Sequence, residues 1–308
     1  MWAAARIAVS EYQILTNHNG TILYPRMPGS LYIVSTPIGN LEDITLRALT
    51  TLKSVGLIAA EDTRRTAILL RHFGITTPTT SFHEHNERQK LPVLLEKLGE
   101  GTDVALVSDA GTPIVADPGQ RLTAAAIERG FRVVPIPGAS AVLSALTASG
   151  FPADEFVFAG FAPSRSNDRK KWLSGLREER RPVVFFEAPH RISRTLSDLA
   201  KLLGDRPIMV GRELTKLHEE LIRTTAAGAL DVAVTEKGEF TVVLGPFVPP
   251  PQKTESLDEE EVEAYFYQIT KSGVLSRRQA IRQTAQEFGL STNELYAMFE
   301  RLKVASPP

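Results

Sequence analysis

The stretch VALVSDAGTPIVADPG, residues 104–119, decides the fold of this chain. An apolar run over 104–107 stops at Ser108 and Asp109, small residues and two prolines follow, and Gly119 opens a helical pattern. This order is typical of a buried strand that ends in a loop. In open α/β sheets such loops bind ligands, and small residues let the backbone approach a ligand closely. Taken alone, the stretch fits a ligand-binding loop and a plain strand–helix connection about equally well.

The same succession of apolar run, polar loop and helical pattern surrounds this stretch. Strands are predicted at 31–35, 57–60, 79–82, 104–107 and 132–136. Helices are predicted at 45–55, 66–73, 91–98, 121–129 and from residue 141 to Ser149. Because strands alternate with helices at this spacing, the sequence predicts βαβ units on a mostly parallel sheet.

The alternation restarts after residue 150. Strands are predicted at 156–161, 183–186, 207–211 and 240–244, with a helix at 192–203 and a short helix at 227–234. A basic, Ser-rich segment at 163–181 interrupts them. We therefore expect a second α/β domain with a mixed sheet, and place the boundary between the two domains within 137–156.

Five parts follow from this division. They are an N-terminal extension, poorly ordered, over 1–28 with Met27 as a candidate start; α/β domains over 29–140 and 141–246; a Pro-rich linker over 247–256; and a helical module over 257–308. In that module, the capping-box patterns of Ser276–Gln279 and Ser291–Glu294 start two helices that flank Gly289. This predicts a helix-turn-helix, with a helical tail packed on the protein or on a partner as the alternative.

Composition excludes several classes of function. The chain has no cysteine, which rules out disulfides, zinc–thiolate sites and thiol nucleophiles. Its net charge of −1 provides no global field for nucleic acid, so any such binding must be local. No signal peptide or apolar run of membrane-spanning length is present, and we expect a cytoplasmic protein. His83 and His85 lie near Glu84 and Glu87 without a metal-ligand spacing, and we expect no metal site.

Six loops at predicted strand ends carry Asp, Thr, Pro, Gly or charged residues. They are 36–43, 61–64, 109–119, 137–141, 187–191 and 212–216. Several such loops can converge on one cleft between two domains. The sequence therefore predicts a small polar cofactor, held largely by the backbone, in an interdomain crevice.

Six motifs resemble the tetrapyrrole-methylase superfamily, and within it the branch that methylates ribosomal RNA. They are STPIGNLEDIT (35–45), AAEDTR (59–64), VSDAGTPIVADPG (107–119), PGASA (137–141), APHR (188–191) and RELTKLHEE (212–220). They span about residues 29–246 in a consistent order, and the helical tail is similar to a module of the same branch. The first loop, Thr36–Asn40, lacks the Gly-Pro-Gly-Asp form of the tetrapyrrole-acting relatives, which favours the RNA branch.

The resemblance implies a fold, a cofactor and a reaction. The fold would be two α/β domains of tetrapyrrole-methylase type with S-adenosylmethionine in the cleft between them, as a homodimer. The reaction would methylate the ribose 2′-hydroxyl of a decoding-centre cytidine, cytidine 1402, of 16S rRNA in the 30S subunit. The implied cofactor contacts are Pro37, Asp109, Ala110, Gly111, Thr112, Val115, Ser140, Ala141, Phe186, Glu187, Leu214, Gly238 and Glu239. We expect Asp109 to position the cofactor or the loop rather than to take a proton.

A ribose hydroxyl is a weak nucleophile, so a base or a cation beside the developing alkoxide should help. We favour Lys216 with Glu213, because they follow a predicted strand end in a loop that faces the cofactor. His190, Asp62 and His85 are further candidates. Each has a structural alternative: pairing of Glu213 with Arg212, helix capping by His190 or Asp62, and a loop hydrogen bond from His85.

RNA contact is expected at a local basic segment. Its residues are Arg165, Arg169, Lys170 and Lys171 beside Trp172, extended by Arg191 and Arg194. A solvated surface is the alternative, since Asp168, Glu178 and Glu179 dilute the positive charge. Two other functions compete with RNA methylation: methylation of a tetrapyrrole or corrinoid precursor, and non-enzymatic nucleic-acid binding on the same fold.

Overall fold

The computed structural model describes residues 15–16, 22–23, 27–232, 235–249, 259–271, 276–288 and 290–305. It divides into two compact units, residues 1–247 and 248–308. Most of the predicted extension over 1–28 and of the predicted linker over 247–256 lies outside the described residues. The described part of the extension is one antiparallel pair, β1 (Leu15–Thr16) with β2 (Ile22–Leu23).

A parallel sheet of five strands forms the first half of the larger unit. Its order is β5 (Thr79–Ser81), β4 (Leu57–Ala60), β6 (Val104–Val107), β3 (Leu31–Val34) and β7 (Val133–Ile136). Every pairing in it is parallel, as the βαβ pattern predicts.

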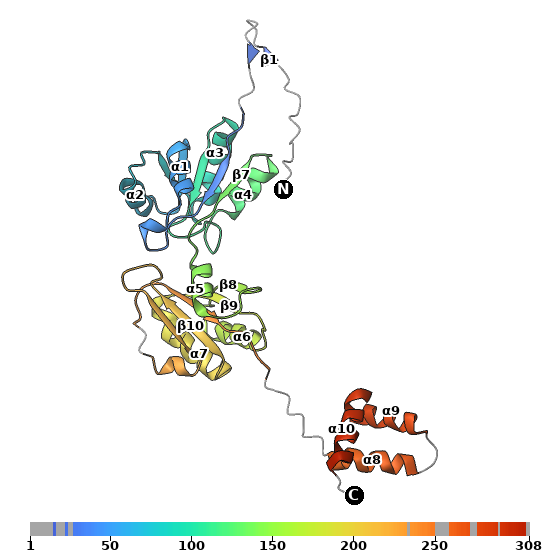
Figure 1. Cartoon of the computed structure of the whole chain (residues 1–308). Coiled ribbons are helices and arrows are strands. Elements are labelled where there is room, and N and C mark those ends of the chain that lie inside the picture. The colour runs from blue at the N-terminus through green and yellow to red at the C-terminus, as the bar shows by residue number, and fades with distance from the viewer. Residues whose placement is uncertain are drawn as a thin grey trace. The chain divides into compact units, whose positions relative to one another are not determined.

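Helices cover both faces of this sheet (Figure 1). Leu52 of α1 (Leu46–Ser54) and Leu69 of α2 (Thr63–His72) pack on one face. Leu95 of α3 (Glu87–Gly99) and Leu122 of α4 (Gln120–Glu128) pack on the other. Strand β6, from the stretch that opened the sequence analysis, is buried along its whole length. Its loop therefore starts from a fixed point at the carboxyl edge of the sheet.

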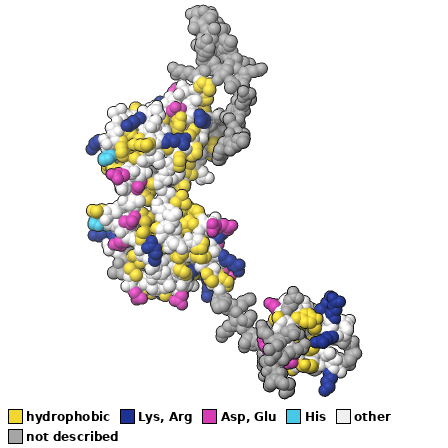
Figure 2. All heavy atoms as spheres, in the orientation of Figure 1, with side chains coloured by type: hydrophobic (Ala, Val, Ile, Leu, Met, Phe, Trp, Pro, Cys, Tyr) yellow, Lys and Arg dark blue, Asp and Glu magenta, His cyan; other side chains and the backbone are white. Residues whose placement is uncertain are grey.

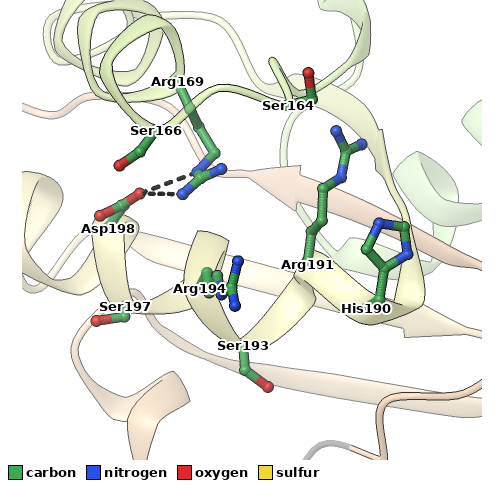
Figure 3. Close-up of a pocket in the computed structure, with 9 residues that line it drawn as sticks. All are labelled: Ser164, Ser166, Arg169, His190, Arg191, Ser193, Arg194, Ser197 and Asp198. Atoms are coloured by element: carbon green, nitrogen blue, oxygen red, sulfur yellow. Dashed lines mark hydrogen bonds and ion pairs between the residues drawn. The ribbon is translucent and has the colours of Figure 1, made fainter.

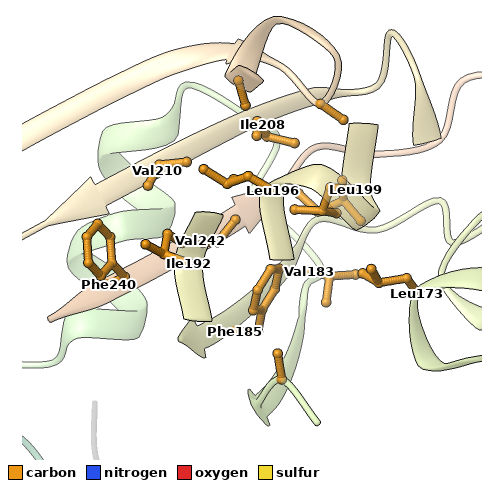
Figure 4. Close-up of a cluster of buried hydrophobic side chains, with 14 residues drawn as sticks. Leu173, Val183, Phe185, Ile192, Leu196, Leu199, Ile208, Val210, Phe240 and Val242 are labelled. Atoms are coloured by element: carbon orange, nitrogen blue, oxygen red, sulfur yellow. The ribbon is translucent and has the colours of Figure 1, made fainter. Parts of the chain in front are cut away.

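The second half of the larger unit is built on a mixed sheet, as expected. Its order is β11 (Glu220–Thr225), β10 (Pro207–Arg212), β12 (Phe240–Leu244), β9 (Val183–Glu187) and β8 (Val157–Phe161). Only β8 and β9 run parallel; the other pairs are antiparallel. Helix α5 (Ala141–Ser149) packs on one face. Helices α6 (Ser166–Gly175) and α7 (Ile192–Leu203) cover the other, around the cluster in Figure 4.

Three details of this half differ from the sequence prediction. Strand β11 was not expected, and helix α6 occupies the segment read only as basic and Ser-rich. The short helix predicted over 227–234 is limited to a 3-10 turn at Gly228–Leu230, while residues 233–234 lie outside the described part.

The smaller unit contains α8 (Glu259–Lys271), α9 (Arg277–Glu287) and α10 (Thr292–Ala305). These helices share a core that includes Val262, Phe266 and Leu295. Both predicted capping boxes form. The Ser276 N–H donates to Gln279 Oε1 at 3.0 Å, and the Ser291 N–H donates to Glu294 Oε2 at 2.8 Å. Among the described helices of the whole chain, none is long and apolar enough to cross a membrane.

Candidate functional site

A pocket of about 400 Å³ lies at the loop ends of both sheets of the larger unit. We call it the cofactor pocket. All predicted cofactor residues except Pro37 and Gly238 line it, and these two adjoin the lining residues Ile38 and Glu239. Its volume falls in the range of roughly 300–1,000 Å³ that is usual for small-molecule sites.

Three loops of the first sheet are tied together at one wall of this pocket. Thr36 and Gly111 exchange two backbone hydrogen bonds, of 2.8 and 3.0 Å. The Ser35 and Thr112 hydroxyl oxygens lie 2.9 Å apart, and Thr112 Oγ1 also donates to the Ala139 carbonyl at 3.4 Å. Gly111 has a φ of 81°, a conformation that favours glycine. The small residues predicted from the opening stretch thus build a wall of backbone.

The Asp109 carboxylate connects this wall to the end of β4. Its Oδ1 accepts from the Asp62 N–H at 3.0 Å, and its Oδ2 pairs with Arg65 at 3.0 Å. The Asp109 N–H donates to Glu61 Oε2 at 3.2 Å. Both carboxylate oxygens of Asp109 therefore hold the loops in place.

Two further acids line the cofactor pocket, and sequence reasoning assigned neither a role. Burial raises the pKa of Asp117 to about 6, helped by the charges of Glu61 and Asp109 and opposed by a hydrogen bond with Ser108. Burial also raises the pKa of Glu61, with the Asp109 backbone hydrogen bond opposing it. The sequence carried a signal for their positions only, because Glu61 belongs to one of the converging strand-end loops and Asp117 to the opening stretch.

The opposite wall is apolar and comes from the second sheet. The Phe186 ring lies 5.4 Å from that of Phe161 and 5.1 Å from that of Phe158, measured between centroids. Leu214 and Ile38 extend this surface. The pocket therefore joins an apolar, aromatic wall to an acidic one. Its lining contains one arginine, Arg65, and five carboxylates: Glu61, Asp109, Asp117, Glu187 and Glu239.

Lys216 and Glu213 form an ion pair beside the cofactor pocket rather than in its lining. Lys216 Nζ lies 2.8 Å from Glu213 Oε1 and 3.2 Å from Glu239 Oε2, and Glu239 lines the pocket. Partial burial lowers the pKa of Lys216, but the hydrogen bond to Glu213 and the charge of Glu239 outweigh it, so the pKa is raised. Burial raises the pKa of Glu213, but the hydrogen bond from Lys216 outweighs this effect, so the pKa of Glu213 is lowered. Lys216 is therefore a stable cation.

Close contacts hold the loop at 213–216 against the loop at 36–43. The Thr215 hydroxyl accepts from the Asn40 N–H at 3.0 Å. A Cβ on Gly39 would lie 2.4 Å from Lys216 Cγ, and one on Gly238 would lie 2.5 Å from Glu213 Cγ. Both glycines are thus required for the ion pair to pack as it does.

The other catalytic candidates have structural roles or lie elsewhere. Asp62 caps α2, accepting from the Arg64 N–H at 2.9 Å, as its structural alternative predicts. Arg212 pairs with Glu220 at 3.0 Å, so the suggested pairing with Glu213 is wrong. The N-cap of α7 is Arg191 rather than His190, which lies in the 3-10 turn Pro189–Arg191. The His85 ring lies 6.0 Å from that of His83, in the turn before α3.

The predicted RNA-binding residues divide into buried and exposed ones. Arg169 corrects our expectation: its side chain is 5% exposed, and its Nε and Nη2 donate to Asp198 Oδ2 at 2.9 and 2.8 Å. It therefore stabilises the contact between α6 and α7. Arg191 is partly buried and pairs with Glu187 at 2.7 Å. Arg165, Lys170 and Lys171 are exposed. Figure 2 shows Lys and Arg side chains scattered among acidic ones over the visible face of the larger unit.

A second pocket, of about 750 Å³, lies next to Arg169 and Arg191 (Figure 3). In the described part of the chain, no group of three or more His, Asp or Glu side chains is arranged to hold a metal ion.

Comparisons with known proteins agree with this arrangement. Residues 30–230 match the family model of the tetrapyrrole (corrin/porphyrin) methylases. A protein of Synechocystis sp. named ribosomal RNA small subunit methyltransferase I is 46% identical over 273 residues, which cover 88% of this chain and 97% of that protein. A protein of the same name from Thermotoga maritima is 48% identical over 218 residues, covering 70% of this chain and 98% of that one.

Solved structures show the same fold. A diphthine synthase superposes with a TM-score of 0.58 at 15% identity, covering 70% of this chain and 90% of its own. The cobalt precorrin-4 methyltransferase CbiF superposes with a TM-score of 0.54 at 18% identity, covering 70% of this chain and 94% of its own.

Proposed function

Because the chain belongs to the ribosomal RNA small subunit methyltransferase I family of the tetrapyrrole methylases, we propose that it methylates 16S rRNA with S-adenosylmethionine. The proposed acceptor is the ribose 2′-hydroxyl of a decoding-centre cytidine. The proposed substrate is the RNA of the small ribosomal subunit, and the proposed state of the enzyme is a cytoplasmic homodimer. The observation that carries the proposal is the cofactor pocket, which gathers the family's motif residues from loops far apart in the sequence.

The chemistry of the pocket fits S-adenosylmethionine. This cofactor carries a positive sulfonium, and the carboxylates of Glu61, Asp109, Asp117 and Glu239 suit a cation. Phe161 and Phe186, whose rings are tilted by 60° to each other, offer aromatic surface of the kind that suits an adenine ring. The backbone of 109–112 presents amide and carbonyl groups without bulky side chains. When bound, the cofactor supplies an electrophilic methyl group.

The chain's own task is to orient and activate the ribose hydroxyl. We propose that Lys216 acts as a cation that stabilises negative charge developing on the ribose oxygen. Its raised pKa argues against a role as the base. Glu213 and Glu239 hold the Lys216 ammonium, which makes Glu213 a positioning residue. Asp117 is the pocket carboxylate best suited to accept the hydroxyl proton, since its pKa of about 6 leaves it ionised yet basic at neutral pH.

The test is transfer of a labelled methyl group from S-adenosylmethionine. The substrates are naked 16S rRNA and 30S subunits from a strain that lacks the modification, and the label is mapped to a nucleotide and to its ribose or base. Asp109→Ala removes the carboxylate that ties its loop to the segment after β4 and should abolish cofactor binding. Asp154→Asn is the control, because Asp154 is exposed and pairs with no described residue. Label on a tetrapyrrole precursor, with none on either RNA, would overturn the proposal.

A further inference from the structure

Every residue that lines the second pocket is polar or charged. It lies between the segment that leads into α6 and the first turns of α7 (Figure 3). Four serines, three arginines, one histidine and one aspartate line it, with no apolar residue among them. Burying an apolar group there would leave polar groups without partners. Its occupant must therefore be polar or charged.

The charge in the second pocket is positive. Its one acid, Asp198, is neutralised by Arg169, and both side chains are less than a tenth exposed. Arg194 is exposed and forms no ion pair with a described residue. His190 adds a ring N–H donor. The balance favours an anion.

Arg191 keeps hydrogen-bonding capacity after its ion pair is made. Its Nη2 pairs with the wholly buried Glu187 carboxylate at 2.7 Å, while its Nε is buried without an acceptor. Figure 3 shows the guanidinium extended toward Ser164. A guanidinium has five donors in a planar fork that matches the oxygens of a phosphate. Arg191 can therefore pair with Glu187 and still donate to an anion.

One turn of the chain separates the two pockets. Ala188 and Pro189 line the cofactor pocket, and the next two residues, His190 and Arg191, line the second pocket. Consecutive Cα atoms are only about 3.8 Å apart, so the linings of the two pockets meet at this turn. If the reacting ribose of an RNA chain lies at the cofactor pocket, a neighbouring phosphate of that chain would lie within reach of the second pocket.

We propose that the second pocket binds a backbone phosphate of the substrate RNA next to the methylated nucleotide, through Arg194 and Arg191. This inference rests on the proposed function, because it takes RNA as the substrate. Binding there positions the ribose without reading the base, since phosphate contacts set register rather than sequence. The Glu187–Arg191 pair then links the RNA site to the cofactor pocket.

The test compares Arg194→Gln with Lys201→Gln in the full-length protein. Lys201 lies on the same helix, is exposed, pairs with no described residue and lies outside the second pocket, so it controls for the loss of one charge. Affinity for 16S rRNA is measured over a series of salt concentrations, together with KM for RNA and Kd for S-adenosylmethionine. For Arg194→Gln we expect the slope of log affinity against log salt to fall by about 0.7–0.9, the change for one phosphate contact. KM for RNA should rise several-fold at unchanged Kd for S-adenosylmethionine, and Lys201→Gln should match the wild type.

The outcomes separate the inference from the proposed function. A wild type that methylates RNA, with the same salt slope and KM in both variants, would overturn the phosphate site and leave the function standing. A loss of affinity for 5′-CMP in Arg194→Gln, with affinity for RNA unchanged, would assign the pocket to a free nucleotide and overturn the inference. A wild type that neither binds nor methylates the RNA would remove the proposed function, and the inference with it.

Discussion

Asp117→Asn should stabilise the protein at neutral pH and leave its stability almost unchanged near pH 3. The pKa of Asp117 is about 6 in the folded protein, against an ordinary value of 3.8. Below both values the carboxyl is protonated in the folded and unfolded states, and it costs nothing. As the pH rises from about 4 to 6, the unfolded chain releases the proton while the folded protein retains it, so stability falls. Above pH 6 the carboxylate is ionised in both states, and the folded protein bears the full free-energy cost of the partly buried charge.

The size of the effect follows from the pKa difference. About two pKa units correspond to roughly 3 kcal/mol, at about 1.36 kcal/mol per unit. Because Asp117 is only partly buried, solvent screening reduces this figure, and we expect about 1–2 kcal/mol. An asparagine can still accept the hydrogen bond from Ser108 and removes only the charge that burial, Glu61 and Asp109 disfavour.

Urea unfolding followed by circular dichroism measures this difference at pH 3.0 and pH 7.5. The midpoint of Asp117→Asn should exceed that of the wild type at pH 7.5 and coincide with it at pH 3.0. Asp154→Asn removes an exposed carboxylate and should show no such pH-dependent difference. An equal or lower midpoint for Asp117→Asn at pH 7.5 would refute the reasoning that burial destabilises the ionised Asp117. If Asp117 is also the base, the same variant should lose activity at every pH.

Three further predictions concern single side chains. Lys216→Met should lower kcat about 10²–10³-fold at unchanged Kd for S-adenosylmethionine, since it removes the cation that we propose stabilises the reacting oxygen; a normal kcat would exclude that role. Arg169→Met should cost about 3–5 kcal/mol of unfolding free energy, because it leaves Asp198 buried without its partner; adding Asp198→Leu should recover much of it, as urea unfolding of both variants will show. Gly119→Ala should cost about 2–4 kcal/mol, since φ is 124° and the new Cβ would lie 2.5 Å from Leu106 Cδ2; a midpoint equal to that of the wild type would contradict this.

Most strands could be predicted because they are buried, and burial leaves an apolar run in the sequence. Strand β6 shows this directly: all four of its residues are buried. Strand β11 was missed for the opposite reason. It is an edge strand, ELIRTT, whose residues are exposed or only partly buried, so nothing in its sequence separates it from a loop.

Helix α6 escaped prediction because few of its residues face the core. Only Arg169 and Leu173 are buried in it, and a buried arginine looks like a surface one in the sequence. The partner that makes Arg169 a structural residue, Asp198, lies on another helix 29 positions later. A pairing at that distance leaves no local pattern.

In the candidate site, too, features with a local sequence pattern were predictable and features that depend on distant residues were not. The backbone wall around Gly111 was predictable, because small residues and prolines at a strand end mark a loop that can approach a ligand. The roles of Glu61 and Asp117 were not, since they depend on burial and on charges brought together from different loops. The character of Lys216 as a cation rather than a base likewise depends on Glu239, 23 residues away.

The position of β3 in the first sheet has a consequence for synthesis of the protein. Strand β3 is flanked by β6 and β7, and Leu31 pairs with Val104 and with Val133. The ribosome therefore releases the apolar residues of β3 long before either neighbour exists. Pairings so distant in sequence form slowly, and an unpaired apolar strand is prone to aggregate until they do. The nascent chain must keep this strand protected until β7 has emerged, which makes the first sheet a natural client of chaperones that act during translation.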